Sequence, residues 1–457
     1  MKKFDAIVIG SGQAGTPLVF QLAEQGQKVA FIEKEHFGGT CLNVGCTPTK
    51  AYVASARRMF EANHGPDLGV IIPPGTRINL PAVKKRKDEL IKKSVSGIED
   101  AVEKNPNITT YLGVGSFTGH KKISINGEEI AAENIYINVG ARARRSEEYR
   151  KAGALTNQEI LQLDELPDHL VIVGGSYIGL EFGQMFKRFG SEVTIIERND
   201  RIISREDEEV SRTIKEVLEG EGINFRLNAT CMGAKRLADG KISTNVDCRD
   251  GDPQVIGTHL LLAMGRVPNT DLLNLESTGV KTDEQGYIEV NDFLETNISG
   301  IYALGDCNGK GGFTHTAYND YEIIAANAFG KNARKISDRI TTYGLFVDPP
   351  LGRVGMTLAQ AEKSGRKIKV GHRPMSRIAR AKEKGETHGF MSVIIDATTD
   401  KILGAAVLGT GGDEIISGIL NIMYADKPYT VIRDSVVPHP TVSELIPTML
   451  EGLKSKD

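Results

Sequence analysis

Two cysteines lie five positions apart in a turn that is rich in glycine and threonine. The segment 38–50 contains Cys41 and Cys46 and ends at Lys50. It follows a glycine-rich loop of the kind that holds a dinucleotide, so the sulfur pair is placed to pass electrons. A structural disulfide is an alternative, but nothing else in the chain indicates secretion. A metal site is equally disfavoured, because two thiolates are half a zinc site and no histidine cluster supplies the rest.

The loop before these cysteines has the spacing of a phosphate-binding turn. Gly10, Gly12 and Gly15 follow an apolar run over residues 4–9, and a helical pattern and a second apolar run come next. This order predicts a βαβ unit in which a helix N-terminus faces a pyrophosphate. The second run ends at Glu33, 23 positions after the first glycine, where a carboxylate can accept from ribose hydroxyls.

The same unit occurs a second time. An apolar run leads into Gly174, a helical pattern begins near Gly179, and a strand pattern over residues 192–196 ends at Glu197, again 23 positions after the first glycine. Ser176 replaces the second glycine, which predicts a slightly less close approach of the backbone to the phosphates. Two such units predict two bound dinucleotides with electrons moving between them; one vestigial site is the alternative.

Three further segments predict buried strands that end in a glycine or an acid. The strand pattern over residues 134–139 ends at Gly140, and the one over residues 260–263 comes just before Gly265. A third predicted strand, residues 296–306, ends at Asp306. Polar groups at the carboxyl end of a strand face the crevice of an open parallel sheet, where ligands bind.

The pattern changes near residue 341 to an α+β segment without a phosphate loop. Near its end, His439 stands five positions before Glu444, and an imidazole oriented by a carboxylate can act as a general base. Taken alone, the pair is better interpreted as a surface histidine in a turn. His315, at the start of a predicted helix over residues 313–329, has no predicted role. The elements predicted for this segment are strands at 389–395 and 402–408 and helices at 357–364 and 413–424.

Composition limits the classes of function. The net charge of −3 gives no excess of positive charge that would attract nucleic acid or an anionic membrane. The basic run at residues 84–87 is interpreted as a solvated helix face. No stretch of about 18 apolar residues is available to span a bilayer, and the N-terminal apolar run is too short for a signal peptide. Five cysteines without framework spacing fit the reducing cytoplasm.

The motifs, in this order, resemble the class I pyridine nucleotide-disulfide oxidoreductases, which include lipoamide dehydrogenase, glutathione reductase and mercuric reductase. The resemblance covers essentially the whole chain and implies an α/β fold with two Rossmann-like dinucleotide-binding domains and a C-terminal α+β dimerisation domain. It implies an FAD-binding domain over residues 1–148, completed by 270–340, an NAD(P)-binding domain over 149–269, and an interface domain over 341–457.

The resemblance also implies residue roles. Cys46 would lie against the flavin, and Cys41 would attack the substrate. His439, oriented by Glu444, would serve as acid and base. The pair Lys50 and Glu181 would lie near the flavin, and Tyr177 would shield it until the nicotinamide arrives. The residues implied to bind FAD are Gly10, Gly12, Gly15, Glu33, Thr40, Lys50, Gly140, Asp306 and Ala317, and those implied to bind NAD(P) are Gly174, Tyr177, Gly179, Glu197 and Gly265.

Residues 313–320 and 348–355 look most similar to the mercuric-reductase-like members. Two departures separate the chain from true mercuric reductases: it has no C-terminal cysteine pair, and it contains the His-Pro-Thr…Glu signature that they lack. The residues at 142–148 also replace a Pro-rich segment, which leaves the crossing between the first two domains open.

The resemblance therefore predicts a cytoplasmic homodimer with shared active sites that contains FAD and prefers NADH to NADPH. It would reduce a small-molecule or protein-bound disulfide, with no metal site and with neither nucleic acid nor membrane as partner. The alternatives are a dihydrolipoyl dehydrogenase, a metal-ion reductase of the mercuric type, and a slowly turning over redox-sensing flavoprotein.

Overall fold

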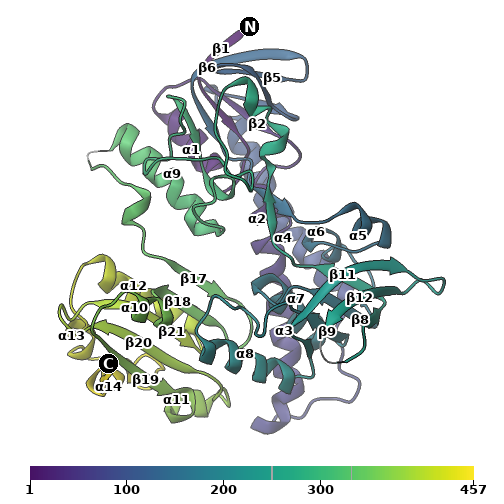
Figure 1. Cartoon of the computed structure of the whole chain (residues 1–457), viewed down its shortest axis with the longest axis vertical. Helices are drawn as coiled ribbons and strands as arrows, with labels where there is room; N and C mark the ends of the chain where they lie inside the picture. Colours follow the sequence, from purple (N-terminus) through teal and green to yellow (C-terminus); the bar gives the residue numbers. More distant parts are fainter. Residues whose placement is uncertain (249–250, 331, 457) are drawn as a thin grey trace.

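The computed structural model describes residues 1–248, 251–330 and 332–456. Figure 1 shows three lobes: the first at the top with the N-terminus, the second at the right around β8 and α7, and the third at the lower left with the C-terminus. Among the described residues, no helix combines the length and apolar character that a membrane crossing requires. The domain limits that we predicted at residues 148, 269 and 340 stay a prediction.

The first lobe is built on a sheet in the order β3-β2-β1-β6-β5-β4, with β16 also paired to β6. The strands β1, β2, β3, β6 and β16 run parallel, whereas β4 and β5 are antiparallel. Continuous apolar runs form the parallel strands because helices cover them: α1 and α9 pack Leu18 and Ile323 against Val8. The bounds are β1 Lys2–Ile9, α1 Gly15–Glu24, β2 Val29–Glu33, β3 Ile108–Leu112, β4 Ser116–Gly119, β5 Lys122–Ile125, β6 Glu128–Ile137, β16 Ile301–Ala303 and α9 Thr314–Phe329.

The strand that we predicted over residues 296–306 is wrong in length, since only Ile301–Ala303 is strand. The Thr296 N–H donates to the Ile301 carbonyl at 2.9 Å and closes a turn. Gly300 lies in this turn with a φ of 78°, a left-handed conformation that glycine adopts without strain. The turn shortens the strand but leaves Asp306 beyond its carboxyl end.

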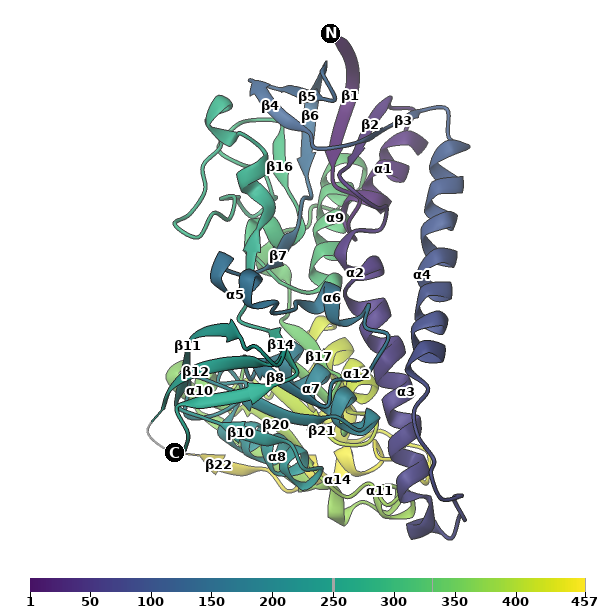
Figure 2. The same ribbon diagram turned by 90° about the vertical axis from the view of Figure 1, so that its right-hand side faces the viewer.

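Three helices leave the first lobe: α2 (Gly39–Asn43), α3 (Cys46–His64) and α4 (Leu80–Glu103). Figure 2 shows α4 along one side of the molecule, with α3 beside its lower part. Our interpretation of residues 84–87 as a solvated face is wrong at Lys87, which is fully buried. Its ammonium donates to the Leu161 carbonyl at 2.9 Å and pairs with Asp88 at 2.8 Å, so the buried charge is satisfied.

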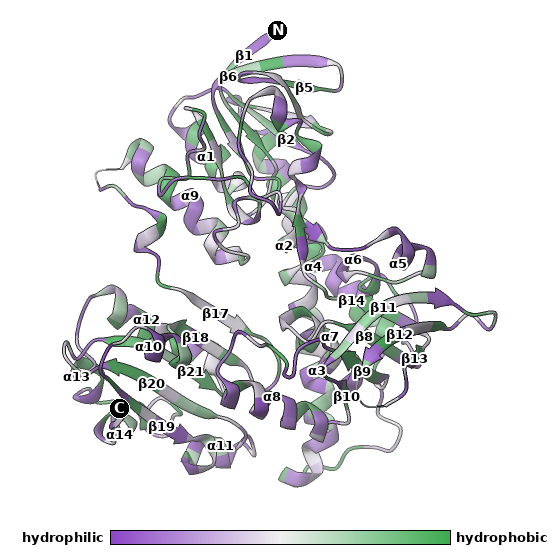
Figure 3. Cartoon of the chain, in the orientation of Figure 1, coloured by the Kyte–Doolittle hydropathy of each residue, from purple (hydrophilic) through white to green (hydrophobic). Residues whose placement is uncertain are grey.

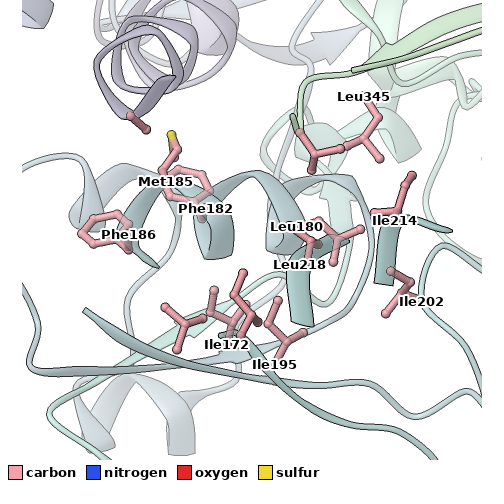
Figure 4. Close-up of a cluster of buried hydrophobic side chains, with 14 of the residues drawn as sticks. Ile172, Leu180, Phe182, Met185, Phe186, Ile195, Ile202, Ile214, Leu218 and Leu345 are labelled. Carbon is pink, nitrogen blue, oxygen red and sulfur yellow. The ribbon is translucent and has the colours of Figure 1, made fainter. Parts of the chain in front are cut away.

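The second lobe repeats the parallel arrangement in the order β10-β9-β8-β14, with an antiparallel sheet β11-β12-β13 beside it. The helix α7 packs on β8 and β9, and Figure 4 shows Phe182 beside Met185 in α7, with Ile172 and Ile195 on the other side of the helix and Leu345 in the same cluster. Leu345 belongs to the third lobe, so one core joins the lobes. The bounds are β8 His169–Val173, α7 Tyr177–Phe189, β9 Glu192–Ile196, α8 Glu208–Gly220, β10 Asn224–Arg226, β11 Ala229–Arg236, β12 Ile242–Cys248, β13 Gln254–Gly257 and β14 His259–Leu262.

The crossing between the first two lobes, which the sequence left open, is a small antiparallel pair of β7 (Ala141–Ala143) and β15 (Arg266–Pro268). Arg142 of β7 pairs with Asp271 at 2.8 Å. The chain then continues into two short helices, α5 (Glu147–Ala152) and α6 (Asn157–Ile160). An ion pair and paired strands therefore form this crossing.

The third lobe is a six-stranded antiparallel sheet in the order β17-β18-β21-β20-β19-β22. Figure 3 shows hydrophobic colouring on the central strands β20 and β21 and hydrophilic colouring on outer helices such as α11. The predicted strands and helices of this segment are confirmed. The bounds are β17 Thr342–Leu345, β18 Leu351–Gly355, α10 Leu358–Lys363, β19 Ile368–Pro374, α11 Ala379–Glu383, β20 Phe390–Asp396, β21 Ile402–Leu408, α12 Gly412–Tyr424, α13 Thr430–Arg433, α14 Leu445–Glu451 and β22 Lys454–Lys456.

Candidate active site

The two cysteines meet where α2 ends and α3 begins. Gly45 makes the turn between them close, because a Cβ at this position would lie 2.8 Å from the Thr40 carbonyl oxygen. A hydrogen bond from the Cys41 thiol lowers the pKa of Cys46 to about 6, and Thr314 and the charge of Lys50 act in the same direction. The same hydrogen bond, together with burial, raises the pKa of Cys41. Of the two thiols, Cys46 is therefore the one that ionises more readily, as a reactive cysteine requires.

Lys50 lies one helical turn after Cys46 on α3, where the spacing i, i+4 places both side chains on the same face. Its ammonium contacts the Glu181 carboxylate at 2.5 Å and lies 4.5 Å from the centre of the Phe346 ring. Glu181 is a buried residue of α7 and also accepts from the Phe346 N–H at 3.1 Å. The structure thus brings together the lysine and the acid that the sequence predicted as a pair.

The two glycine loops close in the same way. The Ser11 N–H donates to Glu33 at 3.0 Å, and the Gly175 N–H donates to Glu197 at 2.7 Å. A carboxylate offers about four lone-pair sites, so each acid keeps acceptor capacity for a ribose.

The glycines themselves are required for the close approach within each loop. A Cβ at Gly10 would lie 2.3 Å from the Asn138 carbonyl oxygen, and one at Gly174 would lie 2.3 Å from the Ala263 carbonyl oxygen. A Cβ at Gly15 or Gly179 would lie 2.1 Å or 1.9 Å from the carbonyl oxygen of the first glycine of its own loop. Both loops therefore fit the tight strand–helix turn that receives a dinucleotide phosphate.

Asn138, which directly follows β6, supports the first loop and was not among the predicted site residues. Its side chain accepts from the Gly15 N–H at 2.9 Å and donates to the Leu304 carbonyl at 2.8 Å. These two hydrogen bonds hold the loop against the segment before Asp306. The signal was available, since an amide in a strand of isoleucine and valine costs free energy unless it is hydrogen-bonded.

The remaining residues predicted to bind a dinucleotide either follow strands or lie in the helices α2 and α9. Asp306 follows β16 and pairs with Arg266 of β15, whose guanidinium also donates to the Ala141 carbonyl. Gly140 and Gly265 both have left-handed φ values, 65° and 96°, at the turns that follow β6 and β14. Thr40 lies in α2, and Ala317 is buried in α9.

Tyr177, predicted as the shield of the flavin, lies among aromatic rings from all three lobes. Its ring centroid is 6.1 Å from that of Phe313 and 5.6 Å from that of Tyr343. The buried Glu206 accepts from the Tyr343 hydroxyl at 2.5 Å and pairs with the buried Arg353 at 2.6 Å. Burial raises the pKa of Tyr177 to about 12, so this hydroxyl stays neutral. Glu206 and Arg353 were not among the predicted site residues.

His315, for which we predicted no role, supports the same aromatic group. Its ring stacks on Phe313 at 5.4 Å, and its Nε2 lies 2.7 Å from the Thr342 carbonyl oxygen. The side chain therefore joins the start of α9 to β17, although it does not contact either sulfur.

His439 and Glu444 form the predicted pair, with Nδ1 2.8 Å from the carboxylate oxygen. His439 is 76% exposed, whereas Glu444 is 14% exposed, so the acid orients an imidazole that faces outward. The pair lies directly before α14, and Figures 1 and 2 place α14 far from α2 and the cysteines. The described chain therefore does not bring this histidine to its own thiols.

Comparison with known proteins defines the family. The family model described as pyridine nucleotide-disulphide oxidoreductase matches residues 4–320, and the model of its dimerisation domain matches residues 341–450. The chain belongs to the pyridine nucleotide-disulphide oxidoreductase family. Its fold class and the class I assignment are thereby confirmed, and the dimerisation domain supports a homodimer.

Individual relatives match over nearly their whole length. The probable pyridine nucleotide-disulfide oxidoreductase RclA of Escherichia coli (strain K12) is 34% identical, over 99% of this chain and 100% of that protein. The dihydrolipoyl dehydrogenase of Thermus scotoductus (strain ATCC 700910 / SA-01) is 33% identical, over 99% and 98%. The solved Cu(II) complex of the HOCl-induced flavoprotein disulfide reductase RclA from Escherichia coli is 32% identical, over 99% and 100%, with a TM-score of 0.90. This chain is accordingly an FAD-dependent NAD(P)H:disulfide oxidoreductase.

Proposed function

We propose that Cys41 and Cys46 are the redox pair of this oxidoreductase and alternate between a dithiol and a disulfide. One observation carries the proposal: two cysteines of unequal acidity lie in hydrogen-bond contact beside the Lys50–Glu181 pair. The low pKa of Cys46 makes it the thiolate, while Cys41 keeps its proton until a base removes it.

The first loop, with Gly10, Gly12, Gly15 and Glu33, would hold the FAD phosphates and ribose, and Asp306 would bind the ribityl chain. The second loop, with Gly174, Gly179 and Glu197, would hold the nicotinamide dinucleotide. Bound FAD supplies the two-electron link between the nicotinamide and the sulfur pair. The Lys50–Glu181 pair would lie near the flavin, and Tyr177, the first residue of α7 after the second loop, would shield the flavin until the nicotinamide arrives.

The thiol half-reaction then follows from the two sulfurs and one base. His439 of the partner subunit removes the proton of Cys41, and the Cys41 thiolate attacks one sulfur of the substrate disulfide. The substrate S–S bond breaks, a mixed disulfide forms at Cys41, and the leaving thiolate takes the proton from the imidazolium. The Cys46 thiolate next attacks the Cys41 sulfur, which releases the second substrate thiolate and forms the Cys41–Cys46 disulfide. NAD(P)H returns the two electrons.

A panel of disulfides tests the function and the alternatives together. We expect steady NADH-dependent turnover with at least one member of a panel that contains lipoamide, small thiol disulfides and a protein disulfide. Turnover restricted to lipoamide would favour the dihydrolipoyl dehydrogenase alternative. The absence of steady turnover with every disulfide, although NADH still reduces the enzyme, would instead favour a redox sensor.

Metal ions should be tested as substrates in the same panel. One solved relative is a Cu(II) complex, and metal-ion reduction was an alternative for this chain. We expect steady turnover with Hg(II) to be poor, because tight binding of the ion at Cys41 and Cys46 would inhibit the enzyme. Sustained turnover at excess Hg(II), with monothiol present, would refute this expectation.

We further propose that NADH is preferred to NADPH. Glu197 is buried at the tip of β9, where it accepts from Gly175 and from both the backbone and the side chain of Asn199. A 2′-phosphate would meet this negative charge, whereas a ribose hydroxyl can donate to it. Arg198 is adjacent and exposed and can soften the preference, so we expect a bias.

The ratio of kcat/KM for NADH to that for NADPH measures this bias directly. Glu197→Gln should lower the ratio, since it removes the repulsive charge but keeps the shape. Glu192→Gln, at the exposed start of the same strand, is the matched control and should leave the ratio unchanged. A higher kcat/KM for NADPH in the unmodified enzyme would overturn the assignment. The cytoplasmic location also stays a prediction.

A further inference from the structure

Thr314 contacts both sulfurs, although it was not among the predicted site residues. It is the first residue of α9, and its hydroxyl oxygen lies 3.1 Å from the Cys41 sulfur and 3.1 Å from the Cys46 sulfur. The cysteines and the threonine are separated by more than 260 positions in the sequence, so the fold alone creates this arrangement. One hydroxyl therefore bridges both reacting atoms.

The hydroxyl has a single proton and can donate to only one of the two sulfurs at a time. It can accept an S–H hydrogen bond from the other sulfur through its lone pairs. A hydrogen bond to an ionised group is stronger than one to a neutral group. The donated bond is therefore expected to turn toward the sulfur that carries the negative charge.

Besides Thr314, three other groups act on the pKa of Cys46. The Cys41 thiol faces it from α2, Lys50 from its own helix, and Glu181 from α7. The charge of Lys50 is partly cancelled by Glu181 at 2.5 Å, which itself raises the pKa of Cys46. A neutral donor at 3.1 Å is not cancelled in this way.

A purely structural role at the start of α9 belongs to a different residue. Thr316 accepts from the Phe313 N–H at 3.2 Å and donates to the Phe313 carbonyl at 2.7 Å, which closes the first turn of the helix. Thr314 directs its hydroxyl to the sulfurs instead. The two threonines, two positions apart, therefore provide a matched comparison.

We propose that the Thr314 hydroxyl is a further catalytic group of the dithiol site, which donates its hydrogen bond to whichever of Cys41 and Cys46 carries the negative charge. In the reduced enzyme the bond goes to Cys46 and holds this sulfur as the resting thiolate. When the base removes the proton of Cys41, the same hydroxyl turns to Cys41 and stabilises the attacking thiolate. This inference rests on the proposed roles of the two cysteines.

The test compares Thr314→Val, Thr314→Ser and Thr316→Val in the FAD-loaded enzyme. Each protein is reduced anaerobically with NADH, and the long-wavelength absorbance that reports the Cys46 thiolate beside FAD is followed against pH. Because the pKa of Cys46 is lowered, this absorbance is present above its midpoint and is lost as the pH falls through it.

Loss of a hydrogen bond to a charged group should raise the midpoint of Thr314→Val by about one pH unit or more. Thr314→Ser keeps the hydroxyl and should retain the wild-type midpoint, and Thr316→Val should do the same. The inference is wrong if Thr314→Val titrates like the wild type, or if Thr314→Ser shifts as far as Thr314→Val.

A second measurement removes the dependence on FAD. Any variant that does not retain FAD is reduced with dithiothreitol, and alkylation at Cys46 is followed against pH by mass spectrometry, with the same expected order of midpoints. If the proposed function is wrong, the wild-type enzyme itself will show neither the long-wavelength absorbance nor a lowered pH midpoint for alkylation of Cys46. A normal wild type with an unshifted Thr314→Val contradicts only the role of Thr314.

Discussion

Replacing Cys46 with serine should lower NADH-dependent disulfide reduction by about 10⁴-fold or more, as loss of a nucleophile commonly does. A serine hydroxyl stays protonated near neutral pH and cannot form the disulfide with Cys41, so the electrons have no route to the substrate. Reduction of an electron acceptor that takes electrons directly from FAD, such as ferricyanide, should continue. The two activities, measured side by side, separate loss of the sulfur pair from loss of the cofactor.

The two cysteines should differ in their spectra although both variants lose disulfide turnover. Cys41→Ser leaves a free Cys46 thiolate, so the long-wavelength absorbance should be present even without reductant. Cys46→Ser should lack it in every state. Cys248→Ser, in β12 of the second lobe, is the matched control and should behave as the wild type. The opposite pattern of spectra would show that the roles of Cys41 and Cys46 are exchanged.

Mixing two inactive variants, His439→Ala and Cys41→Ser, should restore disulfide reduction. Loss of the base alone should cost about 10²–10⁴-fold in the thiol half-reaction, while reduction of the enzyme by NADH stays nearly unchanged. In a heterodimer, the site with intact Cys41 receives His439 from the other subunit. Half of the dimers in an equal mixture are heterodimers with one complete site each, so we expect roughly a quarter of the wild-type activity.

Two features support an active site that is shared between two subunits. His439 is 76% exposed and is oriented by Glu444, so it presents an imidazole outward instead of to the chain that carries it. The dimerisation domain provides the contact between subunits. His372→Ala is a matched control, since His372 lies in β19 of the same lobe as His439, pairs with Glu209 of α8, and should give no defect. If dissociated and reassociated mixtures stay inactive although heterodimers form, each site uses its own His439.

The two dinucleotide units could be predicted from the sequence because their signals are local. A glycine that admits no Cβ, a run of buried strand residues and an acid at the strand tip all fall within about 30 residues. The predicted strand at 192–196 has these bounds in the structure. The β21 strand at 402–408 was equally clear, since its apolar residues are buried on both faces.

The contacts between distant segments could not be predicted in this way. Thr314 reaches the sulfurs only because α9 packs onto the first sheet, and Glu206 meets Arg353 only where the second and third lobes touch. Lys87 was misinterpreted for a related reason: a run of like charges shows composition but not which side chain turns inward. Such features depend on packing between segments that are far apart in the sequence, for which a single sequence has no periodic signal.

The most direct test of the central claim is to count free thiols before and after anaerobic addition of NADH to the FAD-loaded enzyme. Samples are denatured in an alkylating reagent, so that access does not decide the labelling, and the labelled cysteines are identified by mass spectrometry. We predict that NADH adds two labelled thiols per chain, at Cys41 and Cys46. The other cysteines, Cys231, Cys248 and Cys307, should be labelled equally before and after. Unchanged labelling at Cys41 and Cys46, in an enzyme that still turns over a disulfide, would contradict this prediction.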